Sequence, residues 1–163
     1  MKTAVLSGLV LLLTACTQAG TIVAQKPIPT DVSRSSTLGV TVMSSKNIPK
    51  SELQTLETTL AERLTSVGRF REVSAQSVTL DDTRDLTLLV DVITLPKGSI
   101  WDYSLFGEGE VKFDVKLIQR ANGQVIGAAV VNGEASRGIL GSSARNRAVD
   151  EAVNKVVEFV AKP

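Results

Sequence analysis

Histidine is absent from this 163-residue sequence, and cysteine occurs only once. Without histidine there is no imidazole to act as a general base or to complete a Cys/His zinc site, and one cysteine cannot form an internal disulfide. The sequence also lacks a strong charge of either sign, because 18 Lys and Arg residues face 17 Asp and Glu residues. That balance provides no basic field to attract nucleic acid. We therefore expect no nucleic-acid partner, no metal site built on Cys and His, and no histidine-based catalysis.

The residues that are present fit one globular domain behind a targeting segment. Hydrophobic residues make up 43% of the chain and charged residues 21%, as in folded domains of this length. A positive charge at Lys2 precedes the apolar run Ala4–Leu13. At about 1.5 Å per residue this run is too short to cross about 30 Å of hydrocarbon as a helix. The pattern predicts a signal peptide over residues 1–15.

The apolar run ends in Leu13-Thr14-Ala15-Cys16, which resembles the lipobox of bacterial lipoproteins. In a lipobox the cysteine thiol receives diacylglycerol before the preceding peptide is removed, so the resemblance implies lipidation of Cys16. Several acyl chains make a membrane anchor effectively permanent. Thr17 follows the cysteine, whereas the familiar signal for retention in the inner membrane is Asp. The resemblance therefore implies the outer membrane, with the protein on its periplasmic face.

Residues 17–35 are mostly polar or small and show neither helical nor alternating periodicity. Together with Pro27 and Pro29, this composition is typical of a flexible tether. We expect a lipidated N-terminus and tether over residues 16–35, followed by a single domain over residues 36–163. Fully stretched at about 3.3 Å per residue, the tether would reach about 60 Å and hold the domain well away from the lipid.

Apolar residues alternate in some segments after residue 36 and recur at helical spacing in others, which separates strands from helices. Leu38, Val40 and Val42 alternate with smaller or polar residues, whereas Leu56, Leu60 and neighbouring apolar residues recur at helical spacing. The predicted elements are strands at 37–44, 70–75, 86–95, around 111–117 and 124–136, and helices at 51–67 and 143–161. This β-α-β-β-β-β-α order predicts an α+β fold, a mixed sheet with two amphipathic helices on one face.

Local signals mark where several elements begin and end. Ser51-x-x-Gln54 is typical of a capping box, and Gly68 stands where a glycine ends a helix, with Phe70 placed to pack back. Asn122-Gly123 predicts a tight turn and an antiparallel hairpin.

Other residues carry expectations about packing. Asp91 alternates with the apolar residues of its strand, so we expect it on the sheet face away from the helices. Leu89, Ile93 and Leu95 share that side, which predicts that a loop or another subunit covers them. Gly127 and Gly133 predict a bulge or a close backbone contact.

The lipobox, the proline-containing tether and the order of elements together resemble a superfamily of small outer-membrane lipoproteins. The stretches that carry the likeness are LGVTV, VGRF, LTLLVDVITL, LIQRANGQVIG and the Ala/Val-rich last helix, within about residues 13–161. That superfamily includes the curli-secretion channel lipoprotein, activators of penicillin-binding proteins and the lipoprotein of Pel polysaccharide export. Its members are mostly binding or assembly proteins, and several form rings, so the resemblance implies self-association.

The sequence holds no Gly-x-Ser-x-Gly, Ser-x-x-Lys or Walker motif. Two close carboxylate pairs occur, Asp81 with Asp82 and Glu108 with Glu110, and paired carboxylates can hydrolyse a glycoside. Asp85 beside the first pair would also allow a hard-cation site, although EF-hand spacing is absent. Solvated charge is the ordinary role of such pairs, so we predict no enzyme and no cofactor.

Two groups of residues are candidates for contact with partners. Trp101, Tyr103 and Phe106 lie in one loop and are half of the six aromatic residues of the chain. Aromatic residues of this kind are common at protein interfaces, at membrane headgroups and as caps over a core, and all three uses stay open.

Arg137, Arg145 and Arg147 lie near the start of the last helix, where they are solvated, paired with nearby carboxylates, or bind an acidic partner or anionic glycan.

These observations predict a non-enzymatic outer-membrane lipoprotein, an accessory binding or assembly subunit of an envelope export or assembly machine. Its partners would be the membrane, through the lipid on Cys16, and envelope proteins or further copies of itself. The alternative is a periplasmic domain that binds or hydrolyses peptidoglycan or another glycan.

Overall fold

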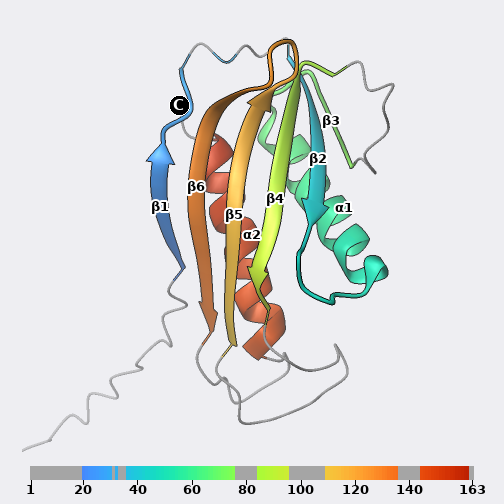
Figure 1. Ribbon diagram of the computed structural model, residues 1–163, viewed down its shortest axis with the longest axis vertical. Helices are drawn as coiled ribbons and strands as arrows, with labels where there is room; N and C mark the ends of the chain where they lie inside the picture. Colours follow the sequence, from blue (N-terminus) through green and yellow to red (C-terminus); the bar gives the residue numbers. More distant parts are fainter. Residues whose placement is uncertain are drawn as a thin grey trace, which may run out of the picture.

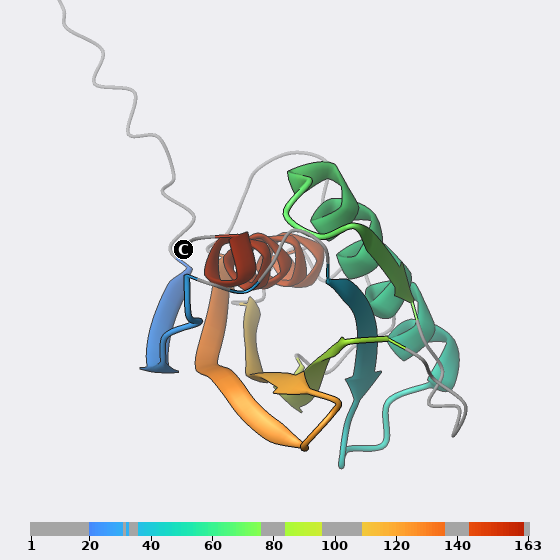
Figure 2. The same cartoon turned by 90° about the horizontal axis from the view of Figure 1, so that it is seen from above.

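A computed structural model of the chain describes residues 20–30, 32, 36–75, 84–95, 109–135 and 144–161. Six strands form one sheet in the order β1-β6-β5-β4-β2-β3, and two helices cover one of its faces (Figures 1 and 2). β2 runs parallel to β3 and β4, and the remaining pairs are antiparallel. The elements are β1 (Thr21–Lys26), β2 (Thr37–Met43), α1 (Lys50–Val67), β3 (Glu72–Ala75), β4 (Leu86–Thr94), β5 (Gly109–Gln119), β6 (Gln124–Ala135) and α2 (Ala144–Ala161).

The predicted α+β class, and the order of elements from β2 to α2, are confirmed. β1 was not predicted, because Thr21–Lys26 lies in the segment expected to be a flexible tether. It adds to the sheet as an edge strand beside β6, with Thr21 opposite Asn132. The sequence does not predict this strand, because it is exposed at almost every position and therefore lacks an apolar alternation.

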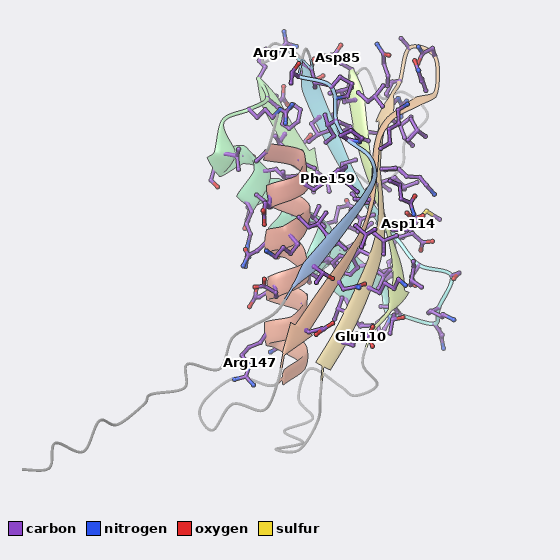
Figure 3. All side chains as sticks on the ribbon, turned by 90° about the vertical axis from the view of Figure 1, so that its left-hand side faces the viewer. Arg71, Asp85, Glu110, Asp114, Arg147 and Phe159 are labelled. Carbon is purple, nitrogen blue, oxygen red and sulfur yellow. The ribbon has the colours of Figure 1, made fainter. Side chains whose placement is uncertain are left out.

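The core lies between the sheet and the two helices. α2 packs on β5 and β6, while α1 packs on β2 and β3 and also touches α2. Alternate residues of the central strands point into this layer and are fully buried, among them Leu88, Phe113 and Val115. From α2, Val156 and Phe159 meet them (Figure 3). Burial of this side of the sheet is the main contribution that these strands make to stability.

Asp91 lies on the opposite face of the sheet, as predicted. Along β4, Leu86, Leu88, Val90 and Val92 are buried, whereas the residues between them are only half-buried. Phe113 shows the same alternation with its neighbours on β5. Because the side-chain period of a strand is two, one residue of slippage would bury Asp91 and expose the core side chains.

α1 begins differently from the prediction. It starts at Lys50, and Pro49 occupies the N-cap position with no side-chain hydrogen bond to the helix. The Pro49 carbonyl accepts the Glu52 amide at 2.9 Å, so the rigid proline is the last residue before the helix. Ser51 therefore lies inside the first turn, and the predicted capping box with Gln54 was wrong.

The end of α1 is as predicted. Gly68 has φ 67°, a left-handed conformation that glycine adopts without steric cost, and its N–H donates to the Thr65 carbonyl at 3.1 Å. Phe70 follows and is buried.

The hairpin between β5 and β6 is antiparallel, as Asn122-Gly123 indicated, but its turn is longer than a two-residue turn. Gly123 has φ 68°, while no non-glycine residue of the described ranges has a positive φ. The Gly123 amide donates to the Gln119 carbonyl at 2.9 Å, and the Asn122 Oδ1 accepts the Gln124 amide at 2.9 Å. Four residues thus close the loop, and Asn122 acts through its side chain.

Both glycines predicted to allow a close approach do so. A Cβ on Gly133 would lie 2.0 Å from the Ala148 carbonyl oxygen, so its absence lets α2 pack directly on β6. A Cβ on Gly127 would lie within van der Waals overlap of Ile28, which follows β1 and is buried. Gly127 therefore provides space for a residue of the predicted tether.

Candidate functional site

Most of the candidate site residues lie outside the described ranges. These residues are Cys16, Trp101, Tyr103, Phe106 and Arg137, together with the carboxylates Asp81, Asp82 and Glu108. Arg145 lies in α2, but its side chain is also outside the description. Arg147 is described: it is half-buried near the start of α2, and a neighbouring group already engages it.

The topology brings the ends of several elements together at one end of the molecule. Thr94 at the end of β4 pairs with Lys112 near the start of β5, and Gly109 pairs with Ala135 at the end of β6. α2 begins at this end as well, and Figure 3 places Arg147 and Glu110 there. The chain therefore leaves and re-enters the described structure at this end on both sides of the predicted aromatic loop.

A groove of about 300 Å³ lies between α1, α2 and the end of β4. Its walls are mostly apolar, with Leu53 and Leu56 from α1 facing Val149 and Val153 from α2. Leu95 lies at its margin, on the helix side and not on the open side as predicted, because the register of β4 shifts between Val92 and Thr94. The sequence did not indicate it, because each of these residues reads as an ordinary core position of an amphipathic helix.

Polar contacts hold the two helices together beside this groove. Arg63 of α1 donates to Asp150 Oδ1 at 2.7 Å and to Asn154 Oδ1 at 2.5 Å, both on α2. Asp150 also lines the groove. The Asp150 side chain is 60% exposed, so this pair contributes little energy and acts mainly to fix the spacing of the helices.

The open face of the sheet carries a small cluster of charges. Asp91 on β4 is directly opposite Asp114 on β5, and Lys116 binds Asp114 at 2.8 Å. The hydrogen bond and charge of Asp114 raise the pKa of Lys116, and Asp91 adds to this effect. Figure 3 shows Asp114 on the side of the sheet away from α2.

Several polar atoms on the open face have no hydrogen-bond partner among the described residues. They are the buried Asp91 Oδ1, Thr87 Oγ1 and Asn132 Oδ1. A face with half-buried apolar side chains and unfilled acceptors fits the expectation that something covers it. Coverage of this face by a loop or another subunit stays a prediction.

Asp85, the described member of the predicted carboxylate cluster, binds the start of another strand. Asp85 accepts the Thr37 amide at 2.8 Å and the Thr37 hydroxyl at 3.0 Å. These two hydrogen bonds, with a smaller effect of Arg71, hold the pKa of Asp85 below its ordinary value. Asp85 and Arg71 lie at the end opposite Glu110 (Figure 3). Asp85 therefore joins the starts of β2 and β4, a structural role that the sequence did not indicate.

Glu57 is a second polar residue whose role became visible only in the structure. It lies on α1 and is 9% exposed, and its Oε2 accepts the buried Val42 amide at 3.1 Å. Its spacing from Leu53, Leu60 and Leu64 places it on the buried side of the helix, which is the only sequence signal for this contact.

Comparison of the sequence with protein-family models and with curated proteins finds no match. Solved structures do match the fold. A PelC dodecamer from Paraburkholderia phytofirmans superposes with a TM-score of 0.63 at 18% identity, covering 89% of this chain and 100% of the PelC chain. The chain has a PelC-like fold. A Xanthomonas campestris protein described under DUF330 superposes with a TM-score of 0.52 at 16% identity, covering 88% of this chain and 91% of that one.

At these identities the PelC-like fold is a statement about architecture, because one fold can serve several functions. It is the α+β architecture that the sequence predicted. No helix in the described part of the chain is long and apolar enough to cross a membrane.

Proposed function

We propose that this protein is a non-enzymatic lipoprotein of the cell envelope, anchored through Cys16, that assembles as an accessory subunit of an export or assembly machine. The observation that carries the proposal is a PelC-like fold over 89% of the chain behind a lipobox. Two independent features, one in the first sixteen residues and one in the fold, thus favour the same class of protein. The outer membrane, facing the periplasm, is the expected location, because Thr17 stands in place of the retention signal.

Self-association is part of this proposal. The matching PelC structures are dodecamers, and a closed ring requires each subunit to present two different surfaces to its neighbours. The domain has two distinct candidates on opposite sides: the apolar groove between α1 and α2, and the open face of the sheet.

Lipidation and assembly can be tested on one preparation. Radiolabelled palmitate is expected in the wild type and not in Cys16→Ser, and mass photometry of the acylated protein in detergent is expected to show a multiple of the subunit mass. Labelling that persists in Cys16→Ser would contradict lipidation of Cys16. A mass of one subunit over the whole concentration range would contradict self-association.

The alternative, binding or hydrolysis of peptidoglycan, has its own test. Purified protein that released muropeptides, and lost this activity in Asp81→Asn or Glu108→Gln, would replace the proposal above. We expect no release from either the wild type or the variants.

A further inference from the structure

The segment expected to be a tether is docked onto the domain at three successive points. Gly20 lies against α2, where a Cβ would be 2.7 Å from the Glu151 Cγ and 3.0 Å from the Lys155 Cγ. β1 then pairs with β6 from Thr21 to Lys26. Ile28 is buried in the core against Gly127. Residues 20–28 are therefore part of the folded domain, and only residues 17–19 separate it from Cys16.

The length of the link between Cys16 and Gly20 limits how far the domain can lie from the lipid. Four peptide units join Cys16 to Gly20, and at most about 3.6 Å per residue gives a reach of about 14 Å. This limit holds whatever conformation those residues adopt. It is about a quarter of the 60 Å expected for a tether that continued to residue 35.

A reach of about 14 Å excludes the orientations of the domain in which Gly20 lies far from the membrane. Thr21 pairs with Asn132, and the eight residues from Asn132 back to Gln124 span about 26 Å at about 3.3 Å per residue, so the β5–β6 hairpin lies beyond reach. β3 lies at the opposite edge of the sheet from β1, and five strand spacings of about 4.8 Å separate them by about 24 Å. The domain therefore cannot stand upright on the hairpin or on the β3 edge while Cys16 is anchored, because Gly20 would then lie farther from the bilayer than the link reaches.

Resting on the proposed anchor, we propose that the surface around Gly20 faces the bilayer and that the short link fixes the orientation of the domain. We call this surface the anchor corner and define it by Thr21, Val23, Glu134, Arg147 and Glu151. Figure 1 shows the start of β1, the end of β6 and the first turns of α2 on the same side of the molecule.

The chemistry of the anchor corner fits a surface held near headgroups by acyl chains. Val23 is 58% exposed and is one of the three large apolar side chains exposed in the described ranges. Arg147 carries the opposite charge to Glu134 and Glu151, so the corner has no excess of positive charge. Attachment therefore depends on the acyl chains and is expected to be insensitive to anionic lipid.

Energy transfer to the membrane tests this orientation. Cys16 is the only cysteine and is consumed by lipidation, so one introduced cysteine is the only free thiol. Glu134→Cys, Asn122→Cys and Glu72→Cys place a donor fluorophore on the corner, the hairpin and β3, and all three positions are exposed. The acylated proteins are reconstituted in phosphatidylcholine vesicles with an acceptor on the headgroups. We expect severalfold stronger transfer from position 134 than from positions 122 and 72.

A lengthened link is the decisive variant. About 20 Gly/Ser residues inserted between residues 19 and 20 add an r.m.s. length of about 25 Å, which exceeds the reach of the native link. The differences between the three positions are expected to collapse, whereas the same residues added after Pro163 are expected to leave them unchanged.

If the protein is acylated and bound but energy transfer is equal from all three positions, the proposed orientation is wrong and the proposed anchor stands. Differences that survive the lengthened link lead to the same conclusion, because contacts rather than the link would then set the orientation. If the wild-type protein purified from cells carries no acyl chains and does not float with vesicles, the proposed anchor is wrong, and so is this inference. Flotation and the mass of the N-terminal peptide therefore separate the two failures.

Discussion

Single polar residues in this protein satisfy backbone groups that the sheet leaves unpaired. Glu57 reaches from α1 to the Val42 amide near the end of β2, and Asp85 binds the Thr37 amide at the start of the same strand. A buried amide without an acceptor costs the full free energy of its desolvation. These two carboxylates therefore belong to the framework of the fold.

Replacement of Glu57 tests this role. We expect Glu57→Leu to lower the free energy of unfolding by about 1–3 kcal/mol, because the buried Val42 amide loses its acceptor. Glu57→Gln keeps a carbonyl oxygen and is expected to cost less. Urea unfolding followed by circular dichroism measures both, with Glu62→Ala on the exposed side of α1 as the control. Equal stability of Glu57→Leu and Glu62→Ala would contradict the role.

At the scale of the element, the main result is that the N-terminal segment is a strand followed by a buried side chain. Isoleucine in a tether would be replaceable without effect. Ile28→Ala is instead expected to destabilise the domain by about 2 kcal/mol or more, since it leaves a cavity against Gly127. Val23→Ala, on the exposed side of β1, is the matched control and is expected to change stability by less than about 0.5 kcal/mol. If Ile28→Ala unfolds at the same urea concentration as the wild type, Ile28 does not stabilise the domain and this segment acts as a tether.

The junction between β2 and β4 gives a prediction about pH. Since hydrogen bonds from Thr37 lower the pKa of Asp85 in the folded protein, its contribution to stability is present above the unfolded value of about 3.9 and is lost as pH falls through the folded pKa. Asp85→Ala is therefore expected to melt below the wild type at pH 7, with a smaller difference at pH 3. Thermal unfolding at both values measures this.

The exposed Glu110→Ala serves as the control for Asp85→Ala. A difference in melting temperature that grew as the solution became acidic would contradict the assignment, because an Asp with a lowered pKa loses its contribution there.

At the scale of the whole molecule, the arrangement places the predicted contact residues in relation to the anchor. The chain on both sides of the aromatic loop emerges at the end of the sheet where β1 begins. We expect Trp101→Ala, Tyr103→Ala and Phe106→Ala in combination to remove one or more in-cell crosslinks between this protein and its neighbours. Mass spectrometry of the crosslinked peptides identifies them. An unchanged set of crosslinks in the folded triple variant would show that the loop is not a contact surface.

The sequence by itself determined the elements with strong periodicity. The alternation in β4 and β5 and the leucine spacing of α1 follow from the burial of one side of each element, which is a local property of the pattern. Gly68 ended its helix as predicted because the left-handed conformation there is also local. The order of these elements was enough to fix the α+β class. Processing of the chain at the lipobox stays a prediction.

Only the tertiary structure decided the features that depend on a partner distant in the chain. β1 is a strand because β6 offers it an edge, Ile28 is buried because Gly127 leaves it space, and Glu57 is an acceptor because β2 ends beside α1. β1 and Ile28 carry no periodic signal of their own, and the spacing of Glu57 indicates only the buried side of α1, not the group that it binds. The free energy that orders them comes from groups about 15 to 110 positions away, so no local window of the sequence contains it.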